Sequence, residues 1–327
     1  MKVWYDACTG KHVRYGVAVA QRLRRLGHEV TLTTRRHPDT IALLELLDEK
    51  CKIVGEYAPN SQSSRLKEGL KRQLAFCEMF ERDPPDYAIS HGSVDLCRVA
   101  FGLGIPIIST ADAPHATAAN KLGLPLVDVL ISSKAIPQRV YKAFGVANII
   151  QFEGVDEVAW VKNRKLEPEE CGEPVIVVRQ METKASYAIG ERDATETIAQ
   201  KLVHLGKVTF LPRYDRRARP NLTVPPSLVD SVNLSATASI VISAGGTLSR
   251  EAALQGTPSI VIRTFGKSYV NDYLSDMGFP LFTVEQSEVL GLVKKHLGQR
   301  RDVKELLERL EDPVDYIEAA IKRCESP

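Results

Sequence analysis

Strand-like apolar runs alternate with helical segments along nearly the whole chain, and this alternation restricts the fold more than any other feature. Runs such as "KVWYDA" (2–7), "DYAIS" (86–90) and "IVISA" (240–244) are each followed by a segment whose apolar residues recur at helical spacing. Strands that alternate with helices pair in parallel, because each helix carries the chain back across the sheet. We therefore expect an α/β protein with helices on both faces of parallel sheets.

The length of 327 residues favours two domains, since a single core rarely grows that large. A polar, charge-rich stretch at 156–173 interrupts the alternation and is interpreted as a linker. This interpretation predicts a first domain over 1–155 and a second over 174–311. A separate helix is expected within 312–327, because Asp312 can cap a helix that begins at the following proline.

The composition excludes several classes of protein. A formal net charge of +2 gives no reason to expect a nucleic-acid partner. The first residues resemble a strand rather than a signal peptide, and no apolar run approaches the length of a membrane span, so a cytoplasmic location is expected. No metal site is expected, because no ligand spacing connects the six cysteines, which are Cys8, Cys51, Cys77, Cys97, Cys171 and Cys324.

A pair of glycines in the second half predicts an anion site. Gly245 and Gly246 follow a buried strand, and a helix is expected to open near Thr247. Glycines let backbone N–H groups approach a ligand, and a helix start adds unpaired donors that suit a phosphate. Glu251, one helical turn further, is placed to accept hydrogen bonds from the two hydroxyls of a ribose. A purely structural turn and a surface glutamate are the alternatives.

Basic side chains follow several predicted strands of the second half. Arg179, Arg213 and Arg263 each come directly after an apolar run, at the edge where ligands bind parallel sheets. Three arginines at one edge favour an anionic ligand, although each could instead form a surface ion pair. Asn271 is a candidate contact to a donor sugar, and ordinary helix packing is the alternative for its segment.

The first turn of the chain carries the candidate catalytic histidine. His12 has a side chain whose usual pKa lies near physiological pH, so it is the preferred general base. A solvated loop histidine is the alternative. Asp112 could act as an acid or base or could only cap a helix. His91 and His115 are secondary candidates.

Three stretches resemble known families. "TGKHVRYGVAVAQRL" (9–23) is similar to the first glycine loop of the MurG-type N-acetylglucosaminyltransferases. "SAGGTLSREAALQGTP" (243–258) resembles the nucleotide loop that this family shares with the non-hydrolysing UDP-N-acetylglucosamine 2-epimerases. "SHGSVDLCRVAFGLGIPIISTADA" (90–113) is closer to the epimerases. The overall pattern also resembles an uncharacterised, mainly archaeal family of the GT-B superfamily.

The resemblance implies a GT-B fold, in which two Rossmann-like doubly wound parallel-sheet domains face each other across a nucleotide-sugar cleft. It implies an acceptor-side first domain, a nucleotide-sugar-binding second domain and a last helix that crosses back to the first. His12 would lie near the acceptor or the sugar. Residues expected to bind the nucleotide sugar, on the resemblance or on their own chemistry, are Gly10, Lys11, Arg179, Arg213, Gly245, Gly246, Thr247, Glu251, Arg263 and Asn271.

Departures from these families leave the reaction open. Lys11 replaces a loop glycine, Ser93 stands where the epimerases carry an acid, and Asp112 replaces their glutamate. The expected function is transfer of a sugar from a UDP-N-acetylglucosamine-like donor, without a metal or a further cofactor. The MurG-like stretch suggests a lipid-linked acceptor at the membrane surface. Epimerisation of a nucleotide sugar and non-catalytic binding are the alternatives.

Overall fold

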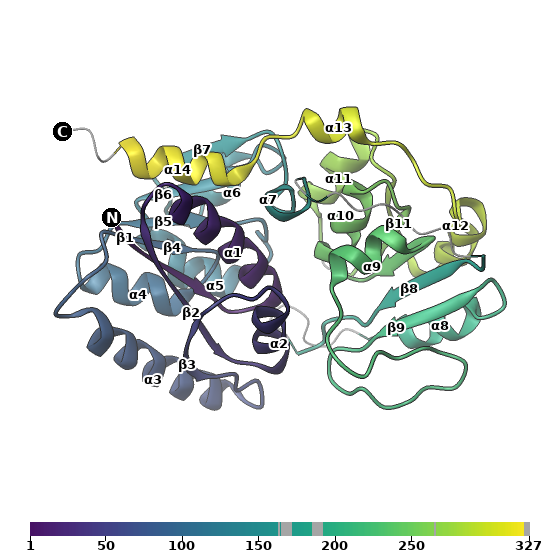
Figure 1. Ribbon diagram of the computed structural model, residues 1–327, viewed down its shortest axis with the longest axis horizontal. Coiled ribbons are helices and arrows are strands. Elements are labelled where there is room, and N and C mark those ends of the chain that lie inside the picture. The colour runs from purple at the N-terminus through teal and green to yellow at the C-terminus, as the bar shows by residue number, and fades with distance from the viewer. Residues whose placement is uncertain (163, 165–171, 185–191, 265, 324–327) are drawn as a thin grey trace. The chain divides into compact units, whose positions relative to one another are not determined.

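The computed structural model describes residues 1–162, 164, 172–184, 192–264 and 266–323. It divides into two compact units. The first unit comprises Met1–Trp160 together with the C-terminal segment from Glu311, and the second comprises Val161–Leu310. Figure 1 shows the helices and strands of both units.

The first unit is built on a seven-stranded parallel sheet in the order β3-β2-β1-β4-β5-β6-β7. Its strands are β1 (Lys2–Ala7), β2 (Glu29–Arg36), β3 (Lys52–Glu56), β4 (Tyr87–Ser90), β5 (Ile107–Thr110), β6 (Val129–Ser133) and β7 (Ile149–Phe152). Its helices are α1 (Gly10–Arg25), α2 (Pro38–Leu46), α3 (Gln62–Phe80), α4 (Val94–Gly102), α5 (Thr117–Gly123), a 3-10 turn at Leu124–Leu126, α6 (Gln138–Lys142) and α14 (Pro313–Arg323). The short helix α7 (Val158–Val161) ends at the boundary of the two units.

Helices cover both faces of this sheet. The indole of Trp4, on β1, packs against Phe76 and Phe80 of α3, with ring centroids 4.7 and 4.6 Å away. The next residue, Tyr5, points to the opposite face, as successive strand residues do. Its ring lies under Gly16 of α1, where an added Cβ would come within 2.5 Å of the ring. Glycine at this position therefore allows α1 to lie close to the sheet.

The second unit is a five-stranded parallel sheet in the order β12-β11-β10-β8-β9. Its strands are β8 (Val175–Arg179), β9 (Lys207–Leu211), β10 (Ile240–Ser243), β11 (Ser259–Ile262) and β12 (Leu281–Val284). Its helices are α8 (Thr195–Leu202), α9 (Ser231–Thr237), α10 (Thr247–Leu254), α11 (Tyr269–Asp276), a 3-10 turn at Gln286–Glu288, α12 (Val289–His296) and α13 (Lys304–Glu308). Alternate residues of β8 and β10 enter two separate apolar clusters, so this sheet is also buried on both faces.

The start of the predicted linker, 156–173, is not a solvated connection. Asp156 and Glu157 are buried in the first unit, which extends to Trp160, five residues beyond the expected boundary. Charged side chains are rarely buried unless they are paired, and here both contact the ammonium of one lysine, as described below. Residues 163 and 165–171 of the predicted linker lie outside the described residues.

The last described helix belongs to the first unit. Helix α14 packs against α1, β6 and β7, and Figure 1 shows it in yellow beside α1 in purple. Its apolar side inserts Val314, Ile317 and Ile321, all buried. Arg22 of α1 forms ion pairs with Asp312, Asp315 and Glu318. The first unit is thus assembled from both ends of the described chain.

Nowhere in the described part of the chain is there a helix with both the length and the hydropathy needed to cross a bilayer.

Candidate functional site

The strand order of the first unit places a ligand site at the ends of β1 and β4. From β1 the chain first builds β2 and β3 on one side and then returns to add β4 on the other. In doubly wound sheets ligands bind at this switch point, outside the carboxyl ends of the strands. Polar side chains from four separate loops gather there, namely Lys11, His12, His91, Asp112, Asp156 and Glu157.

Lys11 is the central cation of this cluster. Its ammonium donates hydrogen bonds to the carboxylates of Asp112 and Asp156, the second at 2.7 Å. A third carboxylate oxygen, on Glu157, lies 3.6 Å from the same nitrogen. The Lys11 side chain is only 12% exposed and those of Asp156 and Glu157 are buried. In such surroundings ion pairs are screened little by solvent, so the lysine holds three loops together.

Asp156 retains its proton more readily than an exposed aspartate. Burial raises the pKa of its carboxyl, and the negative charge of Asp112 raises it further, against the opposing effect of Lys11. A carboxyl group with a raised pKa can donate a proton nearer to neutral pH.

His12 stands in the first turn of α1, which Thr9 caps. Its Nδ1 receives a long contact of 3.4 Å from the backbone N–H of Cys8, and its ring lies edge-on to His91, with centroids 4.8 Å apart. Burial holds the pKa of His12 well below 6.5, and the charges of His91 and Lys11 act in the same direction. The imidazole is therefore neutral at physiological pH and has one nitrogen lone pair with which to accept a proton.

His91 combines with two carboxylates in a geometry that could suit a metal ion. Its Nδ1 lies 2.6 Å from Thr110 Oγ1, while Nε2 lies 3.6 Å from Asp112 and 3.8 Å from Asp156. One ligand atom from each of His91, Asp112 and Asp156 can be chosen so that all lie within 4.8 Å of one another. The Lys11 ammonium contacts both carboxylates and thus places a positive charge where a metal would lie.

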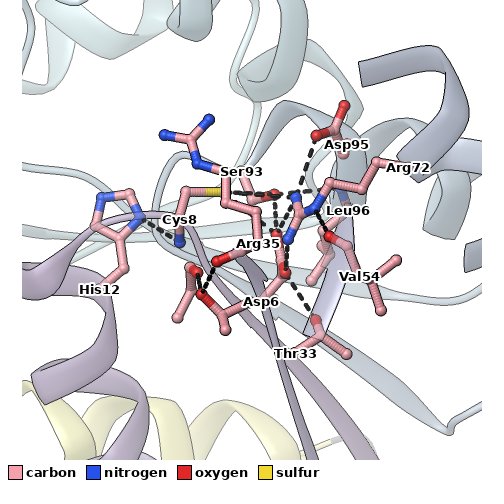
Figure 2. Close-up of polar contacts among 12 residues, drawn as sticks. Asp6, Cys8, His12, Thr33, Arg35, Val54, Arg72, Ser93, Asp95 and Leu96 are labelled. Atoms are coloured by element: carbon pink, nitrogen blue, oxygen red, sulfur yellow. Dashed lines mark hydrogen bonds and ion pairs between the residues drawn. The ribbon is translucent and has the colours of Figure 1, made fainter. Parts of the chain in front are cut away.

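A buried ion pair between Arg72 and Asp6 lies close to the loops that carry this cluster. Arg72 of α3 donates hydrogen bonds from Nη1 and Nη2 to Asp6, at 2.9 and 2.5 Å, and from Nε to the Val54 carbonyl at 2.8 Å. Ser93 and Thr33 donate to the same aspartate, as Figure 2 shows. Burial alone would raise the pKa of Asp6, but the charge of Arg72 and these hydrogen bonds lower it. Ser93, which occupies the position of an epimerase acid, therefore supports the fold.

The second unit carries the predicted glycine loop at its own switch point, at the ends of β8 and β10. Gly245 and Gly246 connect β10 to α10, which begins at Thr247. Ser243 fixes the turn through hydrogen bonds with Gly245 and with Ser249, the latter at 2.8 Å. Gly246, the N-cap of α10, provides no capping side chain, so the helix presents backbone donors of the kind that bind phosphate.

Arginines accompany this loop. Arg213 is held by the Gln180 carbonyl, which accepts from Nε at 2.8 Å, and its Nη2 lies 3.8 Å from the position a Cβ would take on Gly245. Arg179 ends β8 beside Ser243 of β10. Arg250 of α10 passes so close to Gly246 that an added Cβ would lie 2.0 Å from its Nη1. Sequence reasoning missed Arg250, because a mid-helix arginine usually faces solvent.

The structure brings some of the expected residues together and sets others apart. Lys11, His12 and Asp112 meet in the first unit, where Gly10 begins α1. Asn271 is buried and accepts a hydrogen bond from Arg250 at 3.1 Å, and Glu251 is fully buried. Arg263 is exposed and pairs with Glu285 at 3.0 Å, and His115 is exposed before α5.

Asp156 and Glu157 are the residues that sequence reasoning assigned wrongly. They follow β7, whose short run "IIQF" (149–152) ends in a turn at Gly154, but a charge-rich continuation suggested a linker. Their position just after a strand was the signal that could have identified them. A carboxylate pair a few residues beyond a strand lies at the same edge as the residues that follow β1, β4 and β5.

Two doubly wound parallel sheets, each with polar residues at its switch point, define a protein with the GT-B fold. The chain belongs to the family described as "Protein of unknown function (DUF354)", whose model matches residues 1–324. The chain is similar in sequence to the uncharacterised protein MJ0665 of the archaeon Methanocaldococcus jannaschii. It is 32% identical over 336 residues, which cover 97% of this chain and 96% of the relative.

Solved structures share the fold at low identity. The UDP-GlcNAc 2-epimerase of Methanocaldococcus jannaschii, solved in complex with UDP-GlcNAc and UDP, has a TM-score of 0.72 at 11% identity and covers 99% of this chain and all of its own. MurG of Acinetobacter baumannii has a TM-score of 0.58 at 16% identity, with 98% and 99% covered. The expected resemblance to both families is confirmed at the level of the fold.

Proposed function

We propose that the protein is a glycosyltransferase that moves a sugar from a nucleoside diphosphate sugar to an acceptor hydroxyl. The observation that carries the proposal is the neutral, partly buried His12 beside the Lys11 cluster, at the switch point of the first unit. Among proteins with this fold, the M. jannaschii epimerase was solved with UDP-GlcNAc and UDP, which supports a nucleotide sugar as the donor.

The chemistry needs one base and one stabilised leaving group. His12 accepts the proton of the acceptor hydroxyl as the oxygen forms its bond to the anomeric carbon. The bond from that carbon to the diphosphate breaks, and its electron pair leaves with the nucleoside diphosphate. Asp112, fixed by Lys11, orients the acceptor rather than taking its proton, because the ion pair stabilises its charged form.

In this proposal the second unit binds the donor. The backbone donors of Gly245, Gly246 and Thr247 bind the diphosphate, with Arg213 and Arg179 beside it. Such donors stabilise the charge that develops on the leaving group. The roles of Glu251 toward the ribose, and of Arg263 and Asn271 toward the donor, stay predictions, although Arg263 and Asn271 are engaged by Glu285 and Arg250.

Lys11 makes the reaction independent of a divalent metal in this proposal. Its ammonium already forms ion pairs with the two carboxylates that could ligate an ion with His91. A chelator is therefore expected to leave the activity unchanged.

An exposed apolar surface supports an acceptor at the membrane. Leu66, Leu70 and Leu74 lie four residues apart on α3, so they share one face of the helix, and they are 57–64% exposed. Phe101 of α4 and Leu122 of α5 are exposed as well. Lysines flank these leucines along α3 and favour anionic lipid. Co-sedimentation with anionic but not with neutral vesicles is the expected result.

Nucleotide-sugar epimerisation is the second candidate. It needs an acid and a base near one carbon, and Asp156, whose pKa burial raises, lies with Asp112 around the Lys11 ammonium. The higher TM-score to the epimerase than to MurG reflects the fold and does not choose the reaction.

One assay separates these reactions. The purified chain is incubated with UDP-sugars, with and without a lipid extract, and both UDP release and sugar isomers are measured. Release that requires the extract supports transfer. Isomerisation without the extract supports the epimerase, and binding with neither product supports a sensor. No affinity for any nucleoside diphosphate or its sugars would overturn the proposal.

His12→Gln tests the base within the same assay. We expect the rate to fall by about 10²–10⁴-fold, because a positioned base contributes that much. In the wild type the pH profile should stay flat down to about 6.5 and fall only below it, since the pKa of His12 is lowered. His204→Gln, an exposed histidine of the second unit, is the control. An unchanged rate in His12→Gln would exclude this role.

A further inference from the structure

Among the residues that the structure describes, the guanidinium of one arginine at the C-terminal end of β2 has no hydrogen-bonding partner. Arg35 is the penultimate residue of β2, and β2 pairs with β1 up to the contact of Thr34 with Ala7. Its Nε is shielded from solvent and, within the part of the chain that the structure describes, no atom accepts a hydrogen bond from its guanidinium. A buried donor left without an acceptor costs free energy, so its retention requires an explanation.

The neighbouring arginines show that this state is specific to Arg35. Arg72 uses its guanidinium edge on Asp6, Asp95 and the Val54 carbonyl. Arg36, the next residue of the same strand, is exposed and pairs with Glu56 at 3.1 Å. Figure 2 shows that the side chain of Arg35 extends away from the Asp6–Arg72 ion pair.

The guanidinium of Arg35 is nevertheless held in place. Its Cζ lies 4.7 Å from the ring centroid of Tyr57, which packs against His37 at 4.5 Å. The Arg35 carbonyl accepts a hydrogen bond from Thr40 at 3.3 Å, so the backbone is fixed too. Stacking uses the face of a guanidinium and leaves its in-plane N–H groups available, in the fork that matches two oxygens of a carboxylate or phosphate.

Arg35 acts on the catalytic cluster through its charge. Burial raises the pKa of Cys8, and the charge of Arg35 opposes this rise. The same charge adds to the lowering of the pKa of His12, which is due mainly to burial. An anion bound to Arg35 would offset this charge where the acceptor is proposed to meet its base.

We propose that Arg35 and Tyr57 form a subsite for an anionic group, a phosphate or a carboxylate, on the acceptor. The assignment of the group to the acceptor rests on the proposed function, because His12 in the same unit is the proposed acceptor base. Binding of an oxyanion at Arg35 does not depend on transfer and can be tested alone.

The test follows the imidazole resonance of His12 by NMR in the full chain with labelled histidine. Inorganic phosphate and acetate are titrated separately against chloride at constant ionic strength. His12→Gln assigns the resonance. For the anion that fits, a saturable shift is expected in the wild type, and the anion with the lower midpoint identifies the acceptor group as a phosphate or as a carboxylate.

Two variants locate the binding. In Arg35→Gln the midpoint should rise about tenfold or more, because a charge-assisted bidentate contact is lost. Arg35→Lys keeps the charge but loses the paired N–H donors of the guanidinium, so its midpoint should lie between those of the wild type and Arg35→Gln. Arg36→Gln is the matched control and should behave as the wild type. Circular dichroism shows whether each variant folds.

Linear shifts with both anions in the wild type would overturn the subsite, and so would an unchanged midpoint in Arg35→Gln. If Arg35→Gln is unfolded, Arg35→Lys provides the test instead. An unchanged midpoint in Arg35→Lys would also refute bidentate binding of the anion by the guanidinium. Saturable binding in a chain that transfers no sugar would retain the anion subsite and refute the proposed function instead.

Discussion

At the residue scale, the residue at position 11 determines which of two kinds of site its neighbours form, a metal site or an ion-pair cluster around an ammonium. His91, Asp112 and Asp156 offer an imidazole and two carboxylates, a set that binds transition metals in many proteins. The ammonium of Lys11 contacts both carboxylates, and a divalent cation would have to displace it. The Lys11 side chain therefore determines whether these residues surround an ammonium group or a metal ion.

Lys11→Ala should turn the cluster into a metal site. Removal of the ammonium leaves the buried carboxylates without their partner, and binding of Zn²⁺ or Mn²⁺ should become at least about tenfold tighter than in the wild type. Isothermal titration calorimetry measures it, and Lys11→Arg, which keeps the charge, is the control. Equal affinity in the wild type and Lys11→Ala would show that Lys11 does not occupy the metal position.

The Asp6–Arg72 pair should stabilise the first unit. Arg72→Leu leaves a buried carboxylate unpaired and should cost about 3–5 kcal/mol. Addition of Asp6→Asn should restore part of this loss. Because the pKa of Asp6 is lower in the folded protein than its usual 3.8, the pair stabilises the fold above that pH and the stabilisation is lost below it. Urea titrations at pH 7 and pH 3 measure these differences, and a loss below 1 kcal/mol at pH 7 would contradict the assignment.

At the element scale, the sequence pattern located most strands but could not place every loop residue. Runs such as 2–7 and 240–244 are apolar and buried on both faces, so they stand out. The strands β7 and β12 were not predicted, because three of the four residues in each are only partly buried, whereas the equally short β10 is buried throughout. Because β7 was not predicted, Asp156, which follows it, was not recognised as a site residue. Side-chain partners such as Arg250 and Asn271 depend on packing and leave no periodic signal.

Gly246→Ala tests the loop before α10. The new Cβ would displace the end of the buried Arg250 side chain and disturb its hydrogen bond to Asn271, so the melting temperature should fall. Arg250 would then be pushed toward the helix start, and the Kd for UDP should rise about tenfold or more. Gly245→Ala, whose Cβ meets Arg213 at an ordinary 3.8 Å, is the control and should bind UDP almost as the wild type does. Calorimetric titration with UDP compares them.

At the scale of the whole molecule, the GT-B fold followed from the alternation and the resemblance, whereas the composition of the first unit did not follow from sequence order. Its last element, α14, comes from the far end of the described chain. Both tryptophans, Trp4 and Trp160, lie in this unit, so their fluorescence reports on it selectively.

Ile317→Ala with Ile321→Ala should destabilise the first unit alone. Each buried isoleucine truncated to alanine costs about 2–5 kcal/mol. In urea the fluorescence midpoint should fall, while the part of the circular dichroism signal that belongs to the second unit keeps its midpoint. Val289→Ala with Val293→Ala, buried in α12, is the converse control. A fluorescence midpoint that does not move would exclude a supporting role for α14.

Helix α14 also has a consequence for biosynthesis. A ribosome releases residues 1–160 before the second unit, yet the segment that covers α1, β6 and β7 emerges only after the whole of that unit. Until then the nascent first unit exposes the apolar surface that Val314, Ile317 and Ile321 later bury. The second unit, which is continuous in sequence, can complete its fold earlier, so the surroundings of Lys11 and His12 are expected to reach their final form only after residues 161–310 have been synthesised.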